Sequence, residues 1–308
     1  MRIDGKGLID RTTPVTFTFD GARHSGFKGD TLASALLANG VRLVGRSFKY
    51  HRPRGILTAG PEEPNALVEV LDNSSQSPNT RATVQEIYEG LAARSQNRWP
   101  SLRHDVMAVN DLAAPFLGAG FYYKTFMWPR AFWEGLYEPI IRRAAGLGKL
   151  LPQNETAPYE KAFAFCDLLV VGSGPAGLMA ALTAARAGAD VILAEQDSLP
   201  GGRLLAEDSA LGPWLAATLA ELRSLPNVRL MTRTTVVGAY DQGTYAALER
   251  VGLHLPDTPH LPRECFWRIV AGQAIMATGA LERPIAFANN DRPGIMLASA
   301  AQTYLNRF

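Results

Sequence analysis

One stretch of the chain limits its fold more than any other. It runs from Cys166 to Gln196 and reads CDLLVVGSGPAGLMAALTAARAGADVILAEQ. The pattern predicts a buried strand over 167–171, a tight glycine turn, a helix to about Ala187 and a second strand over 191–194. Strand, helix and strand in this order form the repeating unit of α/β folds with a parallel sheet.

Three glycines in the turn, Gly172, Gly174 and Gly177, have the spacing G-x-G-x-x-G. The first permits the tight turn, the second lets a pyrophosphate approach the backbone, and the third lets the helix lie close to the sheet. Pro175 falls in the first helical turn, where a missing N–H costs nothing. Glu195 ends the second strand, where a carboxylate can accept both hydroxyls of an adenosine ribose. The combination predicts a Rossmann-like dinucleotide site, with NAD or FAD favoured because Glu195 would repel the 2′-phosphate of NADP. A turn that binds nothing would not need these residues in register.

Composition excludes several other classes of protein. Cys166 and Cys265 are the only cysteines, and two thiols cannot supply the four ligands of an iron–sulfur cluster or a structural zinc site. The histidines show no metal-ligand spacing, so we expect no metal site. A net charge of +2 does not indicate a nucleic-acid partner. The chain has neither a signal peptide nor an apolar run of the ~20 residues that span a bilayer, so we expect a cytoplasmic protein.

Residues 1–95 are predicted to form a first domain of the α+β class. Its expected elements are, in order, a strand at Val15–Phe19, a turn at Asp20-Gly21, a strand over 23–27, a helix over 31–38 capped by Asp30 or Thr31, and a strand at Ala66–Leu71. Alternating apolar residues indicate the strands, and Ala and Leu at helical spacing indicate the helix. This order is typical of a ferredoxin-like β-grasp domain.

Residues 96–162 are interpreted as a connector dense in aromatic side chains. These are Phe116, Phe121, Tyr122, Tyr123, Phe126, Trp128, Phe132, Trp133 and Tyr137. They could pack between the two domains or form a subunit interface, where aromatic residues are enriched. The proline-containing polar run Leu151–Tyr159 is predicted to be the linker that ends the connector.

Residues 163–308 are predicted to form the dinucleotide-binding domain. After the second strand we expect a helix at Trp214–Leu225, strands at Val228–Met231 and Thr234–Tyr240, a pair of strands at Trp267–Val270 and Gln273–Ala277, and a final helix at Ala298–Phe308. Gly201 and Gly202 allow close backbone approach in the loop after the second strand. Arg203 in the same loop either meets a phosphate or is a surface charge.

Four motifs carry a resemblance to one family. The runs KYHRPRGI, EPNALVEV, GFYYKTFMWP and NNDRPGIM resemble the alpha subunit of heterotetrameric sarcosine oxidase. The resemblance covers essentially the whole chain but only the amino-terminal third of a family subunit. We therefore expect a fragment whose dinucleotide domain is truncated at its carboxy-terminal end. The fragment alone is expected to be inactive and poorly soluble, because an incomplete sheet leaves an exposed edge.

The resemblance implies an oxidoreductase that acts on a CH–NH group with oxygen as acceptor. It implies oxidative demethylation of sarcosine to glycine, transfer of the one-carbon unit to tetrahydrofolate, and production of hydrogen peroxide. The implied partners are beta, gamma and delta subunits, with the amine bound mainly in the beta subunit. The implied cofactors are NAD, with FAD as the alternative, FMN at a subunit interface, and tetrahydrofolate on a missing carboxy-terminal module. Relatives hold cluster cysteines where this chain has Thr58, Ala59 and Gly60, so we expect no iron–sulfur cluster.

The resemblance also assigns cofactor contacts. The expected set is Gly172, Gly174, Pro175, Ala176 and Gly177 at the phosphates, Glu195 and Gln196 at the ribose, Gly202 and Arg203 on the phosphate side, Val237 at the adenine, and Thr278 and Gly279 at the pyrophosphate edge. The last two belong to an ATG motif similar to one in glutathione-reductase-like flavoproteins. No residue is a convincing acid, base or nucleophile, so we expect no catalytic residue in this chain.

Two alternatives stay open. The chain could be the FAD-binding subunit of an opine, proline or amine dehydrogenase, although the missing cluster cysteines argue against it. It could also be a non-catalytic nucleotide-binding scaffold. The glycine fingerprint does not decide between NAD and FAD, because it accommodates both.

Overall fold

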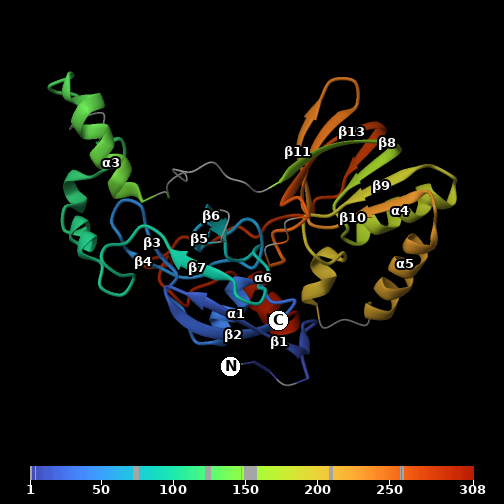
Figure 1. The fold of residues 1–308 in the computed structure, drawn as a ribbon, viewed down its shortest axis with the longest axis horizontal. Helices are drawn as coiled ribbons and strands as arrows, with labels where there is room; N and C mark the ends of the chain where they lie inside the picture. Colours follow the sequence, from blue (N-terminus) through green and yellow to red (C-terminus); the bar gives the residue numbers. More distant parts are fainter. Residues whose placement is uncertain are drawn as a thin grey trace. The chain divides into compact units, whose positions relative to one another are not determined.

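The computed structural model describes residues 2–3, 5–71, 76–121, 126–146, 148, 158–207, 211–256, 258 and 260–308. The chain divides into two compact units (Figure 1). The first comprises Met1–Arg2, Asp10–Glu155 and Pro284–Ala301, and the second comprises Ile3–Ile9, Thr156–Arg283 and Gln302–Phe308. Domain borders at 95 and 162 stay a prediction. The expected linker is mostly outside the described residues, as are Tyr122 and Tyr123.

A five-stranded mixed sheet lies at the centre of the first unit, in the order β2-β1-β7-β5-β6. Its strands are β1 (Asp10–Phe19), β2 (Ala22–Lys28), β5 (Leu67–Leu71), β6 (Gln76–Arg81) and β7 (Ala92–Ser95). β1 pairs parallel to β7 and antiparallel to β2, and β5 pairs antiparallel to both β6 and β7. The expected hairpin, helix and later strand are confirmed, whereas β6 and β7 were not predicted.

Helix α1 (Leu32–Ala38) begins with a capping box. The Thr31 hydroxyl accepts a hydrogen bond from the Ser34 N–H, and the Ser34 hydroxyl accepts one from the Thr31 N–H. The buried carboxylate of Asp30 accepts hydrogen bonds from the Ser34 hydroxyl at 2.7 Å and from the Phe27 N–H at 2.9 Å. Thr31 is therefore the cap, and Asp30 ties the helix to the end of β2.

The rest of the first unit consists of short elements. They are the two-stranded ribbon β3 (Gly45–Arg46) and β4 (Pro53–Arg54), the 3-10 helices η1 (Val106–Asp111) and η2 (Ala114–Phe116), the π-helix η3 (Trp133–Tyr137) and α3 (Glu138–Ala145). η3 leads directly into α3, so residues 133–145 form one continuous helical run. None of the described helices is long and apolar enough to cross a membrane.

A six-stranded sheet forms the second unit, in the order β10-β9-β8-β13-β12-β11. Its strands are β8 (Tyr159–Val171), β9 (Val191–Ala194), β10 (Val228–Met231), β11 (Thr234–Tyr240), β12 (Thr244–Arg250) and β13 (Glu264–Met276). Its helices are α4 (Pro175–Arg186), η4 (Gly202–Ala206), α5 (Gly212–Ser224) and the last helix α6 (Ala298–Asn306), which begins in the first unit. β10, β9, β8 and β13 are parallel, and β12 and β11 add an antiparallel edge.

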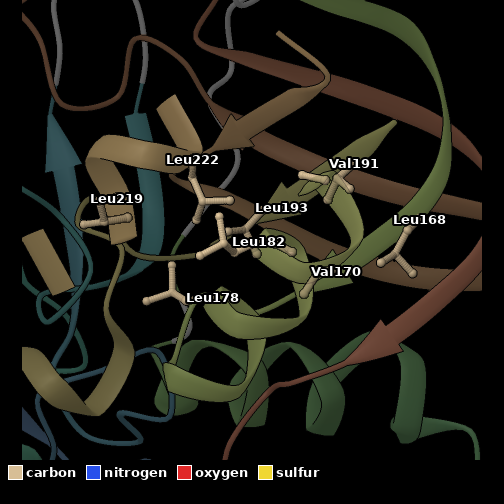
Figure 2. Close-up of a cluster of buried hydrophobic side chains, with 10 residues drawn as sticks. Leu168, Val170, Leu178, Leu182, Val191, Leu193, Leu219 and Leu222 are labelled. Atoms are coloured by element: carbon tan, nitrogen blue, oxygen red, sulfur yellow. The ribbon is translucent and has the colours of Figure 1, made fainter. Parts of the chain in front are cut away.

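Helices α4 and α5 cover one face of this sheet. Figure 2 shows apolar side chains from both helices meeting those of β8 and β9. The buried cluster includes Leu168, Val170, Leu178, Leu182, Val191, Leu193, Leu219 and Leu222. A second cluster, which includes Leu169, Ile192 and Ile269, lies on the opposite side of β8 and β9. Strands buried on both faces explain why their sequences read as continuous apolar runs.

The prediction of two strands over 267–270 and 273–277 is wrong. β13 is one continuous strand that pairs with β8 from Glu264 opposite Tyr159 to Met276 opposite Val171. Gly272 does not interrupt it. A Cβ there would lie 3.1 Å from the Asp167 carbonyl oxygen, so the glycine allows two backbones to approach closely within the pair.

Gly177→Ala tests how closely α4 approaches the turn that precedes it. A Cβ at Gly177 would lie 1.9 Å from the carbonyl oxygen of Gly172, a backbone atom that cannot rotate away. We expect the substitution to lower the free energy of unfolding by about 1–3 kcal/mol, the usual range for overpacking. Urea denaturation monitored by circular dichroism measures this change.

The matched control is Gly212→Ala. Gly212 opens helix α5, and a Cβ there would have no atom within 4 Å. Alanine also has the higher helix propensity, so the control should be neutral or slightly stabilising. Equal stability of the two variants would show that the approach at Gly177 is not tight.

Candidate functional site

The glycine turn leaves an exposed backbone surface at the start of α4. Gly174 is the N-cap, with φ −65° and ψ 179°, and Pro175 and Ala176 are exposed. The first N–H groups of a helix have no partner within the helix and lie at its positive end. A Cβ at Gly174 would have no atom within 4 Å. The turn therefore presents free space beside amides that favour an anion.

Two other glycine-containing segments lie against this turn. Gly202 has φ +55°, and a Cβ there would lie 2.9 Å from the Cα of Gly174. Gly172 has φ +99°, and a Cβ there would lie 2.4 Å from the carbonyl oxygen of Ala277 and 3.4 Å from the Cα of Thr278. Gly279 follows with φ +71°. The structure thus brings three of the expected cofactor segments, 172–177, 202 and 278–279, to one place.

The Glu195 carboxylate lies at the turn, and most of its hydrogen-bond acceptor positions are already used by the protein. Its Oε2 accepts hydrogen bonds from the Ser173 N–H at 2.8 Å and from the Ser173 hydroxyl at 2.6 Å. Its Oε1 accepts one from the Asp197 N–H at 2.9 Å. A carboxylate offers about four acceptor positions, so one position on Oε1 is left for a ligand hydroxyl. To receive both hydroxyls of a ribose, Glu195 would have to lose the Ser173 hydroxyl.

The remaining expected contacts are less well placed. Arg203 is exposed, and its Nε lies 3.8 Å from the Glu207 carboxylate in a loose ion pair. Gln196 is exposed as well, and its carbonyl oxygen accepts a hydrogen bond from Arg250. Val237 is exposed on β11, and in the sheet order β12 and β13 lie between that edge strand and β8.

Neither cysteine thiol of the second unit is activated. Burial raises the pKa of the Cys166 thiol to about 11, and burial also raises the pKa of Cys265. Both thiols are therefore protonated and unreactive near neutral pH. Within the described ranges, no group of three or more His, Cys, Asp or Glu side chains is arranged to hold a metal ion.

In the first unit, a buried carboxylate organises the loop that contains Thr58. Glu63 Oε2 accepts hydrogen bonds from the Leu57 N–H at 3.0 Å, the Thr58 N–H at 2.6 Å and the Thr58 hydroxyl at 3.0 Å. Its Oε1 accepts hydrogen bonds from the Asn65 N–H at 2.8 Å and the Ala66 N–H at 3.0 Å. Its side chain is almost fully buried, so these five bonds compensate for desolvation of the charge.

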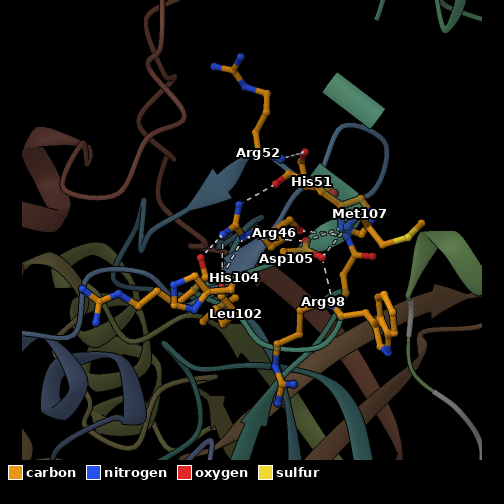
Figure 3. Close-up of polar contacts among 12 residues, drawn as sticks. Arg46, His51, Arg52, Arg98, Leu102, His104, Asp105 and Met107 are labelled. Atoms are coloured by element: carbon orange, nitrogen blue, oxygen red, sulfur yellow. Dashed lines mark hydrogen bonds and ion pairs between the residues drawn. The ribbon is translucent and has the colours of Figure 1, made fainter. Parts of the chain in front are cut away.

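A second buried polar network surrounds His51, whose φ is +52° (Figure 3). Its Nδ1 lies 2.6 Å from Asp105 Oδ2, and its Nε2 lies 3.3 Å from the carbonyl oxygen of Ala144. Arg46 donates to the carbonyl oxygens of His51 and Leu102. The network joins the β3–β4 ribbon to two later segments of the unit. Sequence analysis missed both networks. The members of the His51 network are up to 93 residues apart, whereas the Glu63 bonds are local but follow no motif in the sequence.

Two family models match the chain. Residues 12–98 match the family described as a 2Fe-2S iron-sulfur cluster binding domain. Residues 167–252 match the family described as an FAD dependent oxidoreductase, and this segment contains the glycine turn and Glu195. The ferredoxin-like and Rossmann-like assignments are confirmed.

These matches correct the expected cofactors. We expected NAD first and no iron–sulfur cluster, but one model indicates FAD and the other a cluster-binding domain. The glycine turn fits a dinucleotide such as FAD, because the space beside Gly174 is open and the helix amides face it. For the cluster the fit is poor, because residues 12–98 contain no cysteine and hence no thiolate ligand.

Curated relatives match nearly the whole chain. The chain is 61% identical over 313 residues to "Sarcosine oxidase subunit alpha" of Rhizobium meliloti (strain 1021), covering 100% of this chain and 32% of that protein. The chain is homologous to sarcosine oxidase alpha subunits. A second sarcosine oxidase alpha subunit, from Corynebacterium sp. (strain P-1), is 39% identical over 308 residues, covering 97% of this chain and 27% of that protein. This sarcosine oxidase homologue thus spans about a third of the length of its curated relatives.

One solved structure shares the fold of this sarcosine oxidase homologue. It is an L-proline dehydrogenase from P.horikoshii, with a TM-score of 0.60 and 19% sequence identity. The alignment covers 99% of this chain and 49% of that one. At this identity the likeness concerns the fold alone.

The ion pair between Asp197 and Arg307 predicts a pH-dependent contribution to stability. Two contacts of 2.6 Å join the carboxylate to the guanidinium, and Asp197 is also the residue that donates its N–H to Glu195. Burial alone would raise the pKa of Asp197, but Arg307 outweighs it and the pKa lies below its ordinary value. The pair therefore stabilises the fold above the unfolded-state pKa of about 3.9, and this stabilisation is lost as pH falls through the lower folded-state value.

Arg307→Gln should destabilise the protein by roughly 1–3 kcal/mol at pH 7, because it removes two charge-assisted hydrogen bonds. The difference from the unsubstituted protein should shrink below about pH 4, where Asp197 becomes protonated. Urea denaturation across pH 3 to 7 measures it, with Arg223→Gln on the exposed side of α5 as control. A difference that stays constant across this pH range would contradict the assignment.

Glu63→Gln tests the carboxylate at the centre of the Thr58 loop. A carboxamide replaces one acceptor oxygen by a donor NH2 group, which leaves backbone N–H groups at one end of the loop without an acceptor. Each such buried group costs about 1–3 kcal/mol, so the loop should open more often. Hydrogen exchange of residues 57–66 should accelerate, whereas Glu62→Gln next to it should change little. Unchanged exchange in the Glu63 variant would remove the carboxylate from this role.

Proposed function

We propose that this chain is the dinucleotide-binding part of the alpha subunit of a sarcosine-oxidising flavoenzyme, and that the dinucleotide is FAD. The observation that carries the proposal is the open backbone at Gly174, at the exposed N-terminus of α4. It lies in the segment that matches FAD-dependent oxidoreductases, in a chain 61% identical to a sarcosine oxidase alpha subunit. The complete enzyme would oxidatively demethylate sarcosine to glycine, pass the methyl carbon to tetrahydrofolate or release it as formaldehyde, and reduce oxygen to hydrogen peroxide.

The proposed pyrophosphate position is beside the backbone of Gly174, Pro175, Ala176 and Gly177. Anion binding there needs no cationic side chain, because the helix amides and dipole favour the negative charge. Gly202 borders this position, with Thr278 and Gly279 on the side of Gly172. A side chain at Gly174 would fill this space, whereas side chains at Gly177 and Gly202 would meet the backbone of the turn itself.

The proposed ribose position is at Glu195. Its free acceptor position on Oε1 suits one ribose hydroxyl, and the Ser173 hydroxyl can rotate to leave room for a second. Gln196 adjoins it along the chain. Arg203 is flexible enough in its exposed position to reach a phosphate, and Val237 is proposed at the adenine end.

The chemistry divides between the cofactor and the protein. A bound flavin accepts two electrons from an amine, and the protein supplies binding and orientation. In this proposal the described residues of this chain bind and orient the cofactor, and the two thiols, whose pKa values burial raises, take no part. We therefore infer that the amine is bound mainly by another subunit, the beta subunit. The proposed assembly also contains gamma and delta subunits, and its proposed location is the cytoplasm.

A proline, opine or amine dehydrogenase is the second candidate. The shared fold of the L-proline dehydrogenase is compatible with it but identifies no substrate. That likeness is at 19% identity, against 61% over the whole chain for the sarcosine oxidase subunit. Sarcosine is therefore the preferred substrate, and comparing turnover of sarcosine and proline by the assembled enzyme distinguishes the two.

Gly174→Ala tests the proposed FAD site. The added methyl group has no atom within 4 Å and φ is −65°, so folding should be unaffected. It would occupy the space proposed for the pyrophosphate, and the dissociation constant for FAD should rise by about tenfold or more, equivalent to ~1.4 kcal/mol. Quenching of flavin fluorescence on titration with the purified protein measures it, with Gly212→Ala as control.

Three outcomes would contradict the proposal. One is FAD binding by Gly174→Ala with unchanged affinity. Another is a loss of affinity accompanied by a lower melting temperature, which would indicate a folding defect instead. The third is that the protein without substitutions binds NAD and not FAD.

A further inference from the structure

Residues 106–145 carry an unusual amount of exposed apolar surface. No residue of η1, η2, η3 or α3 is buried. We name the described residues 106–121 and 126–145 the helical arm. Nine of its large apolar side chains are between 46% and 84% exposed. They are Val106, Val109, Leu112, Phe116, Met127, Trp128, Phe132, Leu136 and Ile140.

Three of these side chains form a stripe on one side of a helix. Phe132, Leu136 and Ile140 follow one another at intervals of four residues, along the run that η3 and α3 form, so they lie on the same face. Glu138 and Arg142 lie on the other face, where two hydrogen bonds of 2.8 and 2.5 Å join their side chains. The helix is therefore amphipathic, with its polar face self-paired and its apolar face exposed.

The arm is held in place although it is exposed. Lys49 Nζ donates to the carbonyl oxygen of Gly118 at 3.1 Å, and the Tyr50 hydroxyl donates to that of Leu117 at 2.9 Å. At the other end, His51 Nε2 lies 3.3 Å from the carbonyl oxygen of Ala144. One loop thus holds the arm at two places, in its first half and near its last residue, and Figure 1 shows α3 in green beside the β3–β4 ribbon. A surface ordered before binding has less entropy to lose when a partner docks.

The exposed area matches what a stable complex requires. At roughly 100 Å² each, nine such side chains expose on the order of 800–900 Å², about the ~800 Å² that each partner buries in a standard interface. Three aromatic residues and a methionine are of the types enriched at interfaces.

We propose that the stripe Phe132–Leu136–Ile140 docks into an apolar groove on a different subunit of the enzyme. An amphipathic helix that offers apolar side chains at such intervals is recognised in this way. The inference rests on the proposed function, because the homologues are named as alpha subunits and an alpha subunit has other subunits as partners. The partner is therefore a chain of different sequence with a groove lined by apolar side chains.

The test uses the complete alpha subunit co-expressed with the other subunits of the oxidase. The double variant Leu136→Glu and Ile140→Glu places two charges in the stripe while keeping good helix formers. Glu134→Lys is the control, because it changes a charge on the opposite side of the same helix. Partner subunits that co-purify with a tagged alpha subunit are quantified by mass spectrometry. We expect about a tenfold loss in the double variant and no loss in the control.

Three other outcomes would contradict docking of the stripe on a different subunit. Full co-purification by the double variant overturns the proposal. A dimer of the alpha subunit alone that the double variant disrupts would identify a second copy as the partner. Slow hydrogen exchange of residues 132–140 in the alpha subunit alone would show that its own chain covers the stripe. Flavin absorbance of the tagged subunit is recorded in parallel, so failure of the proposed FAD site is seen separately.

Discussion

The geometry of the second unit depends on one backbone contact. Helix α4 approaches the preceding turn so closely that a methyl group at Gly177 would lie 1.9 Å from the carbonyl oxygen of Gly172. Gly172 in turn is pressed against the carbonyl oxygen of Ala277 at the end of β13. These contacts fix the helix start between β8 and β13. The only glycine of the fingerprint with open space beside it is Gly174, so the packing that excludes side chains elsewhere also leaves one place where a ligand can reach the backbone.

The Glu195 carboxylate stabilises two segments, one through each of its oxygens. It stabilises the turn through Ser173, and it holds the following loop through the N–H of Asp197. A ligand hydroxyl can use the one remaining acceptor position, and a second must displace the Ser173 hydroxyl. Asp197, whose N–H donates to Glu195, is itself paired with Arg307. A residue near the end of the chain therefore fixes the loop that follows Glu195. Binding and loop stability are therefore coupled at this carboxylate.

Local patterns predicted the elements of the candidate site, and non-local contacts were missed. Apolar runs bounded by glycine residues predicted three strands, β9, β10 and β11, and the helix α4. β12 was missed because its sequence, TYAALER, has alanine and leucine spacing that does not alternate, and its strand character comes from pairing on both sides. The cofactor expectation failed for a different reason. The expectation came from the missing cysteine ligands, whereas the family match depends on the sequence of the whole domain. The chain retains that domain, and the Glu63 carboxylate lies at the centre of its Thr58 loop.

The loop between β3 and β4 shows how a basic motif can be explained without a ligand. Lys49 to His51 hold the helical arm, while Arg52 and Arg54 both bind the Asp291 carboxylate, at 2.8 Å each. The hydrogen bond from Arg52 lowers the pKa of Asp291, so the carboxylate stays charged and offsets one of the two positive charges. Neighbouring residues of one short ribbon therefore position two segments that are far apart in the sequence.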